Sequence, residues 1–454
     1  MRHLILIVTC FAILSSCNSK KHLSLIEEEK LEFVMPELFS SINVNYKIDK
    51  SAINDTFNTV IDSYLSSDLQ LSALGMDVLV EKNKEANIQF LERSVLTTLP
   101  LKISLSKNNI LGNIRASGIL ELNFVTQLDV DASWQLFTET KLEQYEWIEE
   151  PKLSLGGLRL SIGSLANSII DKSKAQFEKQ IDDSVADQLE IRSKVLETMK
   201  YIEQPLLIDT LLNSWVNFEP TDVKMSSFLN SGIYASGNLT VHGKTKISEN
   251  EPEYIKSSQL PKFEWDKDVE PESHLNLVFD ISYQHINKYL NDNYKGKKFE
   301  NNGKYVILED IELKKSDKKL VVVSNVTGSV NGELLISSVP RFDNEKQAFF
   351  ADDIVINIKT KNVIHKAGAW MFKSKIKNQL KEMMYFSIAD NLEDIQKTID
   401  KQVENYSIPE KLEITANLDK INVDKFVLDV DRVHAFIGID LILETKILDM
   451  SAFK

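Results

Sequence analysis

The chain is poor in cysteine, with two among its 454 residues. Cys10 lies inside an apolar N-terminal stretch, and Cys17 follows directly after it. If that stretch is removed on export, one thiol remains and no internal disulfide can form. The folded body must then be stabilised by the burial of apolar side chains.

Sequence patterns for catalysis are also missing. The chain has only 15 glycines, with no phosphate-cradling loop and no G-x-S-x-G nucleophile elbow. Its seven histidines form no H-E-x-x-H pair and show no spacing typical of zinc. Asp129 with Asp131, and Asp429 with Asp431, are carboxylate pairs that can bind a cation but more often form a solvated strand edge. We therefore expect a protein that is not an enzyme and uses no metal or cofactor.

Positive charge is in deficit, since 53 Lys and Arg face 67 Asp and Glu and give a formal net charge of -14. Such a chain repels phosphate backbones, so nucleic acid is not an expected partner. No segment after the N-terminus approaches eighteen consecutive apolar residues, so no transmembrane helix is predicted. The length is too great for one core and suggests two or three domains.

The N-terminus has the layout of a secretory signal, with Arg2, an apolar run from Leu4 to Leu14, and Ser15 and Ser16 before Cys17. The run is too short to span a bilayer, which requires about 20 residues. The segment resembles a bacterial lipobox, which implies cleavage after residue 16 and acylation of Cys17, for example with palmitate. The alternative is a plain signal peptide with an incidental cysteine. We assign residues 1–16 to the signal and 17–40 to a lipidated tether.

An internal repeat relates the two halves of the chain. Residues 42–58 align without a gap to residues 275–291, at an offset of 233. The alternating segments 158–162 and 354–358, and the segments 239–247 and 439–447, repeat in the same order. This pattern predicts a duplicated assembly, with an N-terminal domain at 41–248 and a C-terminal domain at 274–454. The polar, proline-bearing residues 249–273 form the expected connection.

Each half contains an apolar stripe at helical spacing. The first runs from Ser168 to Ile202 without Pro or Gly, and the second from about Val363 to Tyr406. A helix of forty-odd residues would reach about 60 Å, so we expect the second to bend near 385–390. The surrounding segments alternate apolar and polar residues, which is typical of antiparallel sheet with one solvated face.

Three motifs carry a resemblance to a known family: Asn213–Pro220 with its Trp215, Val339–Asp343 after Gly332, and Asp353–Asn362 leading into Trp370. Over nearly the whole mature chain, the sequence resembles an uncharacterised family of bacterial lipoproteins of about 450 residues. That family is itself similar to the tubular lipid-binding (TULIP) superfamily, which includes bactericidal permeability-increasing protein (BPI). The resemblance implies an α+β fold of two tandem domains, each a strongly curved antiparallel sheet wrapped around a long amphipathic helix.

The resemblance also implies an apolar groove between helix and sheet that accepts acyl chains. For any single residue of the stripes, core packing is the more common role. The groove candidates are Phe177, Ile181, Val185, Leu189, Met199, Ile364, Ala367, Met371, Leu380, Met384 and Ile388.

We expect a lipid-anchored protein that binds or transfers lipids or other amphiphiles. The alternative is a structural or scaffold lipoprotein of the cell envelope with packed grooves and protein partners. Lys20 and Lys21 follow Cys17 closely, where surface-exported lipoproteins carry acidic residues. This favours the periplasmic face of the outer membrane, with the acyl anchor as the membrane contact and protein partners unspecified.

Overall fold

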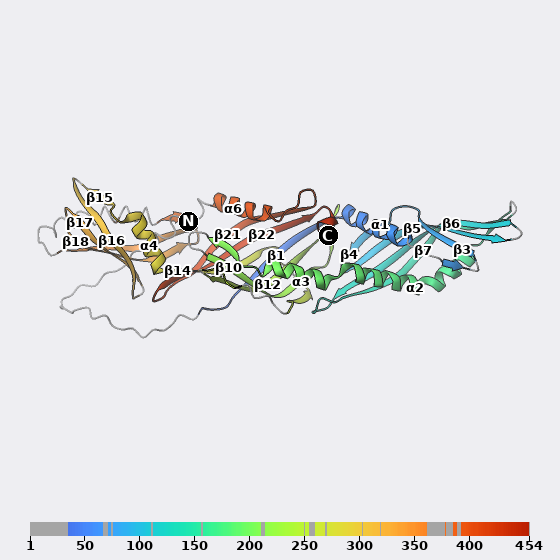
Figure 1. The fold of residues 1–454 in the computed structure, drawn as a ribbon, viewed down its shortest axis with the longest axis horizontal. Coiled ribbons are helices and arrows are strands. Elements are labelled where there is room, and N and C mark those ends of the chain that lie inside the picture. Colours follow the sequence, from blue (N-terminus) through green and yellow to red (C-terminus); the bar gives the residue numbers. More distant parts are fainter. Residues whose placement is uncertain are drawn as a thin grey trace.

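The computed structural model describes residues 35–453 except 67–70, 74–75, 110–111, 156–157, 210–213, 249, 254–258, 268–269, 302, 318, 361–376, 378–384 and 388–391. The molecule is elongated, with a central sheet between two end sheets (Figure 1). One end sheet comes wholly from residues 71–161 and the other from residues 298–387. The central sheet combines strands from both sequence halves, so the two predicted domains share one sheet.

The N-terminal end sheet is antiparallel, in the order β2-β3-β5-β6-β7-β8, with β4 beside β5. In β6, Leu120, Leu122 and Phe124 are buried while Glu121 and Asn123 between them are not. This alternation arises because successive side chains of a strand point to opposite faces. The strands are β2 (Leu71–Ala73), β3 (Met76–Lys82), β4 (Asn87–Leu91), β5 (Ser94–Asn109), β6 (Gly112–Val130), β7 (Leu136–Leu155) and β8 (Leu158–Ser161).

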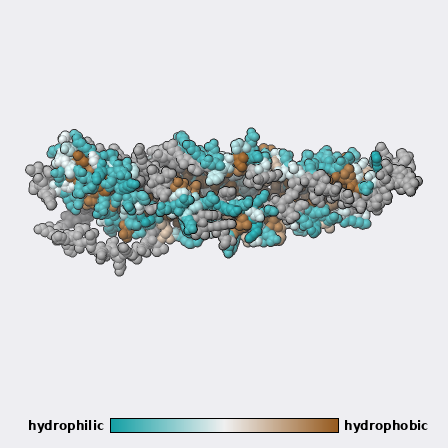
Figure 2. Space-filling view, in the orientation of Figure 1, coloured by the Kyte–Doolittle hydropathy of each residue, from teal (hydrophilic) through white to brown (hydrophobic). Residues whose placement is uncertain are grey.

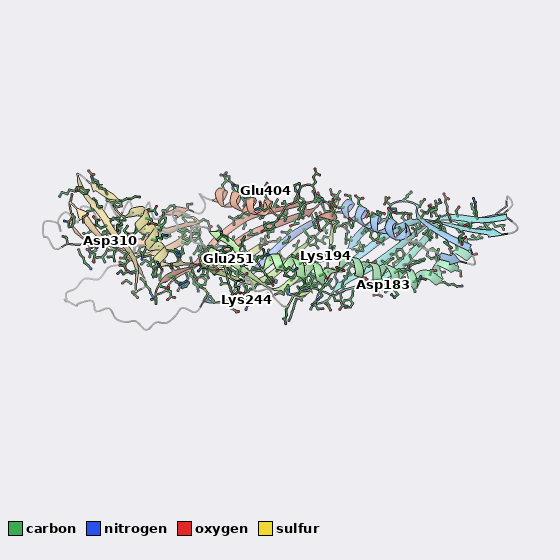
Figure 3. All side chains as sticks on the ribbon, in the orientation of Figure 1. Asp183, Lys194, Lys244, Glu251, Asp310 and Glu404 are labelled. Carbon is green, nitrogen blue, oxygen red and sulfur yellow. The ribbon has the colours of Figure 1, made fainter. Side chains whose placement is uncertain are left out.

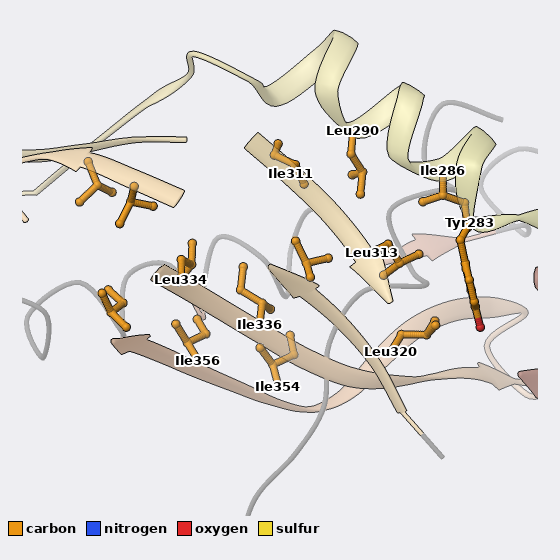
Figure 4. Packing of buried hydrophobic residues seen from close by; sticks show 14 of the residues in the cluster. Tyr283, Ile286, Leu290, Ile311, Leu313, Leu320, Leu334, Ile336, Ile354 and Ile356 are labelled. Atoms are coloured by element: carbon orange, nitrogen blue, oxygen red, sulfur yellow. The ribbon is translucent and has the colours of Figure 1, made fainter. Parts of the chain in front are cut away.

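The C-terminal end sheet is an antiparallel meander in which each strand pairs with the next. Its apolar face packs under helix α4 (Tyr283–Tyr294), and the side chains of Ile286 and Leu320 are fully enclosed (Figure 4). The strands are β15 (Lys298–Asn301), β16 (Lys304–Ser316), β17 (Lys319–Gly328), β18 (Gly332–Asp343), β19 (Ala348–Lys359) and β20 (Phe386–Ser387).

The central sheet has the order β13-β10-β12-β1-β14-β22-β21, with β9 and β11 paired to β10 and β12. Strand β1 is antiparallel to β12 and β14, and its C-terminal part runs parallel to β22. About the β1–β14 contact, β10-β12-β1 on one side mirrors β14-β22-β21 on the other, and β13 is an additional strand. The strands are β1 (Leu38–Asp49), β9 (Leu206–Asp209), β10 (Ser214–Met225), β11 (Leu229–Ser231), β12 (Tyr234–Ser248), β13 (Lys262–Trp265), β14 (Ser273–Ser282), β21 (Leu412–Leu428) and β22 (Arg432–Ile447).

The predicted fold class is wrong. Most of the described residues lie in strands, and no sheet wraps around one long amphipathic helix. The first predicted helix is divided into α2 (Gly163–Leu189) and α3 (Ile191–Ile202), because Glu190 between them adopts a left-handed φ of 37° that ends the helical hydrogen bonding. Residues 363–391 of the second predicted helix lie almost entirely outside the described part of the chain. The described residues that follow them form α6 (Leu392–Glu404). The remaining helices are α1 (Lys50–Ser66) and the short η3 (Met450–Phe453).

The helices of the described part border the sheets. Helix α1 contacts β3 and β4, α2 contacts β7, α4 contacts β16, and α6 contacts β21. None of these helices is long and apolar enough to cross a membrane.

The sequence repeat corresponds to one hydrogen-bonding arrangement that is present in both halves. Asn58 of α1 exchanges hydrogen bonds with both backbone groups of Ala86, at 2.7 and 3.1 Å. Asn291 of α4, 233 residues later, does the same with Ile311 of β16, at 2.7 and 3.2 Å. The amide side chain imitates a neighbouring strand, so each asparagine fastens a helix to a sheet.

A second pair of equivalent residues joins the two halves. The backbone N–H of Asn43 donates to the Ser273 hydroxyl at 2.8 Å, and the N–H of Asn276 donates to the Ser40 hydroxyl at 2.9 Å. Each asparagine amide also donates to the carbonyl of the residue before the opposite serine, at 2.7 Å in both cases. Because both serines and both asparagines are 233 residues apart, the contact has an approximate two-fold axis.

Candidate functional site

The predicted groove residues fall into three groups. Phe177, Ile181 and Val185 are half-buried on α2. Met199 is buried on α3. The side chain of Leu189 lies outside the described part, as do Cys17 and the C-terminal candidates Ile364, Ala367, Met371, Leu380, Met384 and Ile388.

Helix α2 is held by a polar stripe that the apolar pattern did not indicate. The Thr140 hydroxyl donates to the Asp182 carboxylate at 2.7 Å, and the Leu142 N–H donates to Glu178 at 2.8 Å. The Trp147 indole donates to the Asn167 side chain at 2.7 Å. These bonds satisfy backbone and ring donors along β7, so α2 covers the edge of the sheet. A spacing of three to four residues between Asn167, Asp171, Lys174, Glu178 and Asp182 is the sequence signal for this stripe.

The N-terminal end sheet is less completely covered than its counterpart. A row of apolar residues crosses five strands in register, and only Ala116 within it is buried. Leu160 at the end of the row is 56% exposed. The row consists of Val78, Leu105, Ala116, Leu153 and Leu160.

The surface in general offers no broad apolar patch on the face that Figure 2 shows. Brown hydrophobic residues there are small spots separated by teal hydrophilic ones.

One recess is present where the C-terminal end sheet meets the central sheet. It has a volume of about 300 Å³ and lies between the end of β18 and strand β21. We call it the seam pocket. Its apolar lining is Val339, Pro340, Phe342, Val423, Phe426 and Leu428, and its polar lining is Arg341, Asn344, Asp424 and Lys425.

Aromatic packing holds the two walls of the seam pocket together. The Phe349 ring is 4.7 Å from the Phe342 ring on one wall and 6.0 Å from the Phe426 ring on the other, both in edge-to-face arrangements. Phe349 and Val423 are buried in this cluster. Edge-to-face contacts of this kind add about 0.5–1.5 kcal/mol each beyond area burial. The pocket is therefore preformed.

The charged groups of the seam pocket lie at its rim. Arg341 is exposed, and its Nε is 2.9 Å from the Asp352 carboxylate. The Lys425 ammonium lies 4.4 Å from the centre of the Phe436 ring. Beside the rim, a hydrogen bond from Lys346 lowers the pKa of Asp343, which keeps that carboxylate ionised. The recess thus has apolar side chains in its lining, but polar atoms form the larger part of its exposed surface, including those of Arg341, Lys425 and Asp424.

One protein-family model matches most of the chain. The model of a domain of unknown function, DUF4403, matches residues 39–447. The chain belongs to the DUF4403 family. No curated protein sequence matches this DUF4403 chain.

Two solved structures resemble the DUF4403 chain over most of its length. A crystal structure of lipopolysaccharide binding protein has 10% identity and a TM-score of 0.26, covering 92% of this chain and 100% of the other. The structure of P47 from Clostridium botulinum A2 has 11% identity and a TM-score of 0.22, covering 89% and 96%. At such TM-scores neither likeness carries an argument about this chain.

Among the described residues, no group of three or more His, Cys, Asp or Glu side chains is placed to hold a metal ion. The segment Val339–Asp343 carries part of the family resemblance, and nothing in its sequence indicates that it forms one wall of a pocket. The opposite wall is about eighty residues further along the chain, and no local pattern links the two segments.

Proposed function

We propose that this DUF4403 protein binds an amphiphile without chemical conversion, with an apolar chain in the seam pocket and the polar head at its rim. The seam pocket itself carries the proposal. Its volume of about 300 Å³ is at the lower end of ligand pockets, which span roughly 300–1,000 Å³. Each methylene moved into such a recess gains about 0.8 kcal/mol. Lys425 at the rim can bind an anionic head, whereas the charge of Arg341 is already paired with Asp352.

The proposal includes attachment to a membrane through Cys17 and a location on the periplasmic side of the outer membrane. It is supported by the signal-like N-terminus and by Lys20 and Lys21 after the cysteine. Metabolic labelling with palmitate tests the anchor, since Cys17→Ser must abolish the label. Proteolysis on intact cells tests the side, and cleavage there would contradict a periplasmic location.

A structural role is the second candidate. The observation that favours it is the cluster of buried apolar side chains in the C-terminal end sheet, where Ile286 and Leu320 have no exposed surface. A scaffold protein would bind a stoichiometric protein partner and no amphiphile.

The binding of a fluorescent fatty acid to residues 18–454 separates these candidates. This chain contains every helix and strand described above. Val339→Trp places a large ring in the seam pocket and should lower the affinity for the fatty acid at least tenfold. Ile181→Trp is the matched control, because Ile181 is also half-buried but lies on α2 beside the other end sheet.

Each outcome of this experiment has one interpretation. Loss of affinity in Val339→Trp alone supports the seam pocket. Loss in Ile181→Trp alone moves the acyl site to α2 and overturns the assignment to the seam pocket. No binding of fatty acid by the unmodified chain, or equal binding by all three proteins, overturns the proposed function.

A further inference from the structure

A basic segment stands out on this acidic chain, at the end of the molecule that the C-terminal end sheet forms. Residues 294–305 hold four lysines and one glutamate, a formal charge of +3 on a chain of net charge -14. They comprise the end of α4, strand β15 and the start of β16, which project at one extremity (Figure 1). We call this segment the basic hairpin.

The lysines of the basic hairpin are arranged over tyrosine rings. The Lys297 ammonium is 4.4 Å from the centre of the Tyr294 ring, and the Lys298 ammonium is 4.6 Å from that of Tyr305. All four lysines are exposed, while Tyr294 is half-buried. Burial raises the pKa of Tyr294, so its hydroxyl stays neutral. The result is a surface of neutral aromatic rings carrying positive charge.

Ion pairing neutralises only part of this charge. Lys298 pairs with Glu300 at 2.6 Å, and Lys295 pairs with Asp310 at 3.3 Å, the latter residue being labelled in Figure 3. Lys297 and Lys304 have no carboxylate within ion-pair distance among the residues described. Two cations on one short hairpin are thus available to an external anion.

The backbone holds the basic hairpin in a fixed shape. Gly303 turns the chain between β15 and β16 with a φ of 74°, a conformation that side chains disfavour. Gly328 lies directly against the Tyr305 ring, where any Cβ would collide. The N–H of Tyr305 donates to the Ser329 hydroxyl at 3.0 Å. The ring under Lys298 is therefore positioned before any partner arrives.

We propose that the basic hairpin docks on the surface of an anionic phospholipid membrane. Lysines next to tyrosines suit the headgroup region, because the rings rest at the interface while the ammonium groups meet lipid phosphates. Negative lipid surfaces attract clustered lysines over about one Debye length, near 8 Å at physiological salt. An acidic protein would use the charge but would gain less from the ring surface. This inference is independent of the seam pocket and of Cys17.

Vesicle co-sedimentation of residues 18–454 tests the inference without the acyl anchor. The chain should bind vesicles containing phosphatidylglycerol at least tenfold more tightly than vesicles of phosphatidylcholine alone, and added salt should weaken the binding. The double variant Lys297→Glu with Lys298→Glu should lose at least tenfold. The matched control reverses Lys314 and Lys315, two lysines of the same sheet at the β16–β17 turn.

The variants distinguish local docking from net charge. Retained binding in the control and loss in the hairpin variant support the proposal. Equal losses in both would show a general charge effect and would overturn it, as would equal binding to both kinds of vesicle. Capture by immobilised polyglutamate but not by vesicles would assign the hairpin to an acidic protein. Lys297→Gln with Lys298→Gln repeats the comparison without introducing new negative charge.

Discussion

Replacement of Asn291 by alanine tests whether its hydrogen bonds to Ile311 hold helix α4 against the sheet. The Asn291 amide donates to the carbonyls of Ile311 and Asn287, at 2.7 and 2.8 Å, and its oxygen accepts from the Ile311 N–H at 3.2 Å. Ile311 is 5% exposed, so its N–H and carbonyl have little access to water once the side chain is gone. A buried polar group left without a partner costs about 1–3 kcal/mol. We expect Asn291→Ala to destabilise the C-terminal end sheet by about 2 kcal/mol.

Asn293→Ala is the control for this measurement. Asn293 lies on the same helix, but it is exposed and its amide donates only to the Tyr289 carbonyl within the helix, at 2.9 Å. Both substitutions gain the same helix propensity, roughly 0.6 kcal/mol, so their difference isolates the contact with β16. The control should change stability by less than about 0.5 kcal/mol.

Urea unfolding and amide hydrogen exchange give the two readings. A cost of about 2 kcal/mol predicts that the Ile311 amide exchanges roughly 30-fold faster in Asn291→Ala, if exchange occurs through local opening. Asn58→Ala should do the same for Ala86, its partner in the first repeat. If the Asn291 and Asn293 variants unfold at the same urea concentration, the asparagine does not hold the sheet and the argument is refuted.

Three further predictions concern other sites. The hydrogen bond to Asp440 raises the pKa of His274 above 6.5, so this pair stabilises the central sheet at pH below 6.5 and the contribution is lost as pH rises through the raised value. Asp440→Asn should flatten the pH dependence of the urea midpoint, and an unchanged dependence would exclude the pair as its source. Ile286→Ala opens a cavity at a fully enclosed position and should cost about 2–5 kcal/mol in urea unfolding, whereas a cost under 1 kcal/mol would show that the helix shifts to fill it. Trp134→Phe removes the 2.6 Å bond from the buried indole to the Pro261 carbonyl and should cost about 1–3 kcal/mol, with faster proteolysis of the connecting segment; unchanged proteolysis would contradict a tethering role.

Local patterns predicted the parts of the fold that depend on local rules. Alternation at Leu120, Leu122 and Phe124 predicted a strand with one buried face, and that strand is β6. The gapless repeat of 42–58 in 275–291 predicted equivalent structures, and Asn58 and Asn291 make equivalent hydrogen bonds. The fold class failed for a different reason. Helical spacing is the same on both sides of Glu190, so periodicity cannot show that the helix ends there.

The candidate site was beyond local patterns. The seam pocket needs Val339 and Phe426 to meet across two different sheets, and that meeting depends on where β21 lies in the central sheet. The polar stripe of α2 is present in the sequence, but the apolar spacing of the helix gives no role to Asp182 and Glu178. Only the position of the β7 edge shows that these carboxylates accept backbone and hydroxyl donors.

The two halves share equivalent hydrogen bonds, but the described hydrophobic clusters of their end sheets differ in size. Equivalent asparagines hold α1 and α4, and equivalent serines join β1 to β14. Among the described residues, the cluster under α4 has 17 buried apolar members and the cluster under α2 has 6, and partly buried apolar residues pack against both. Solid packing resists a change of even one methylene, whereas a loosely covered apolar face can admit a foreign chain. After a duplication, one copy can therefore keep the rigid role and leave the other free to change, and the Ile181→Trp control measures whether the N-terminal copy has done so.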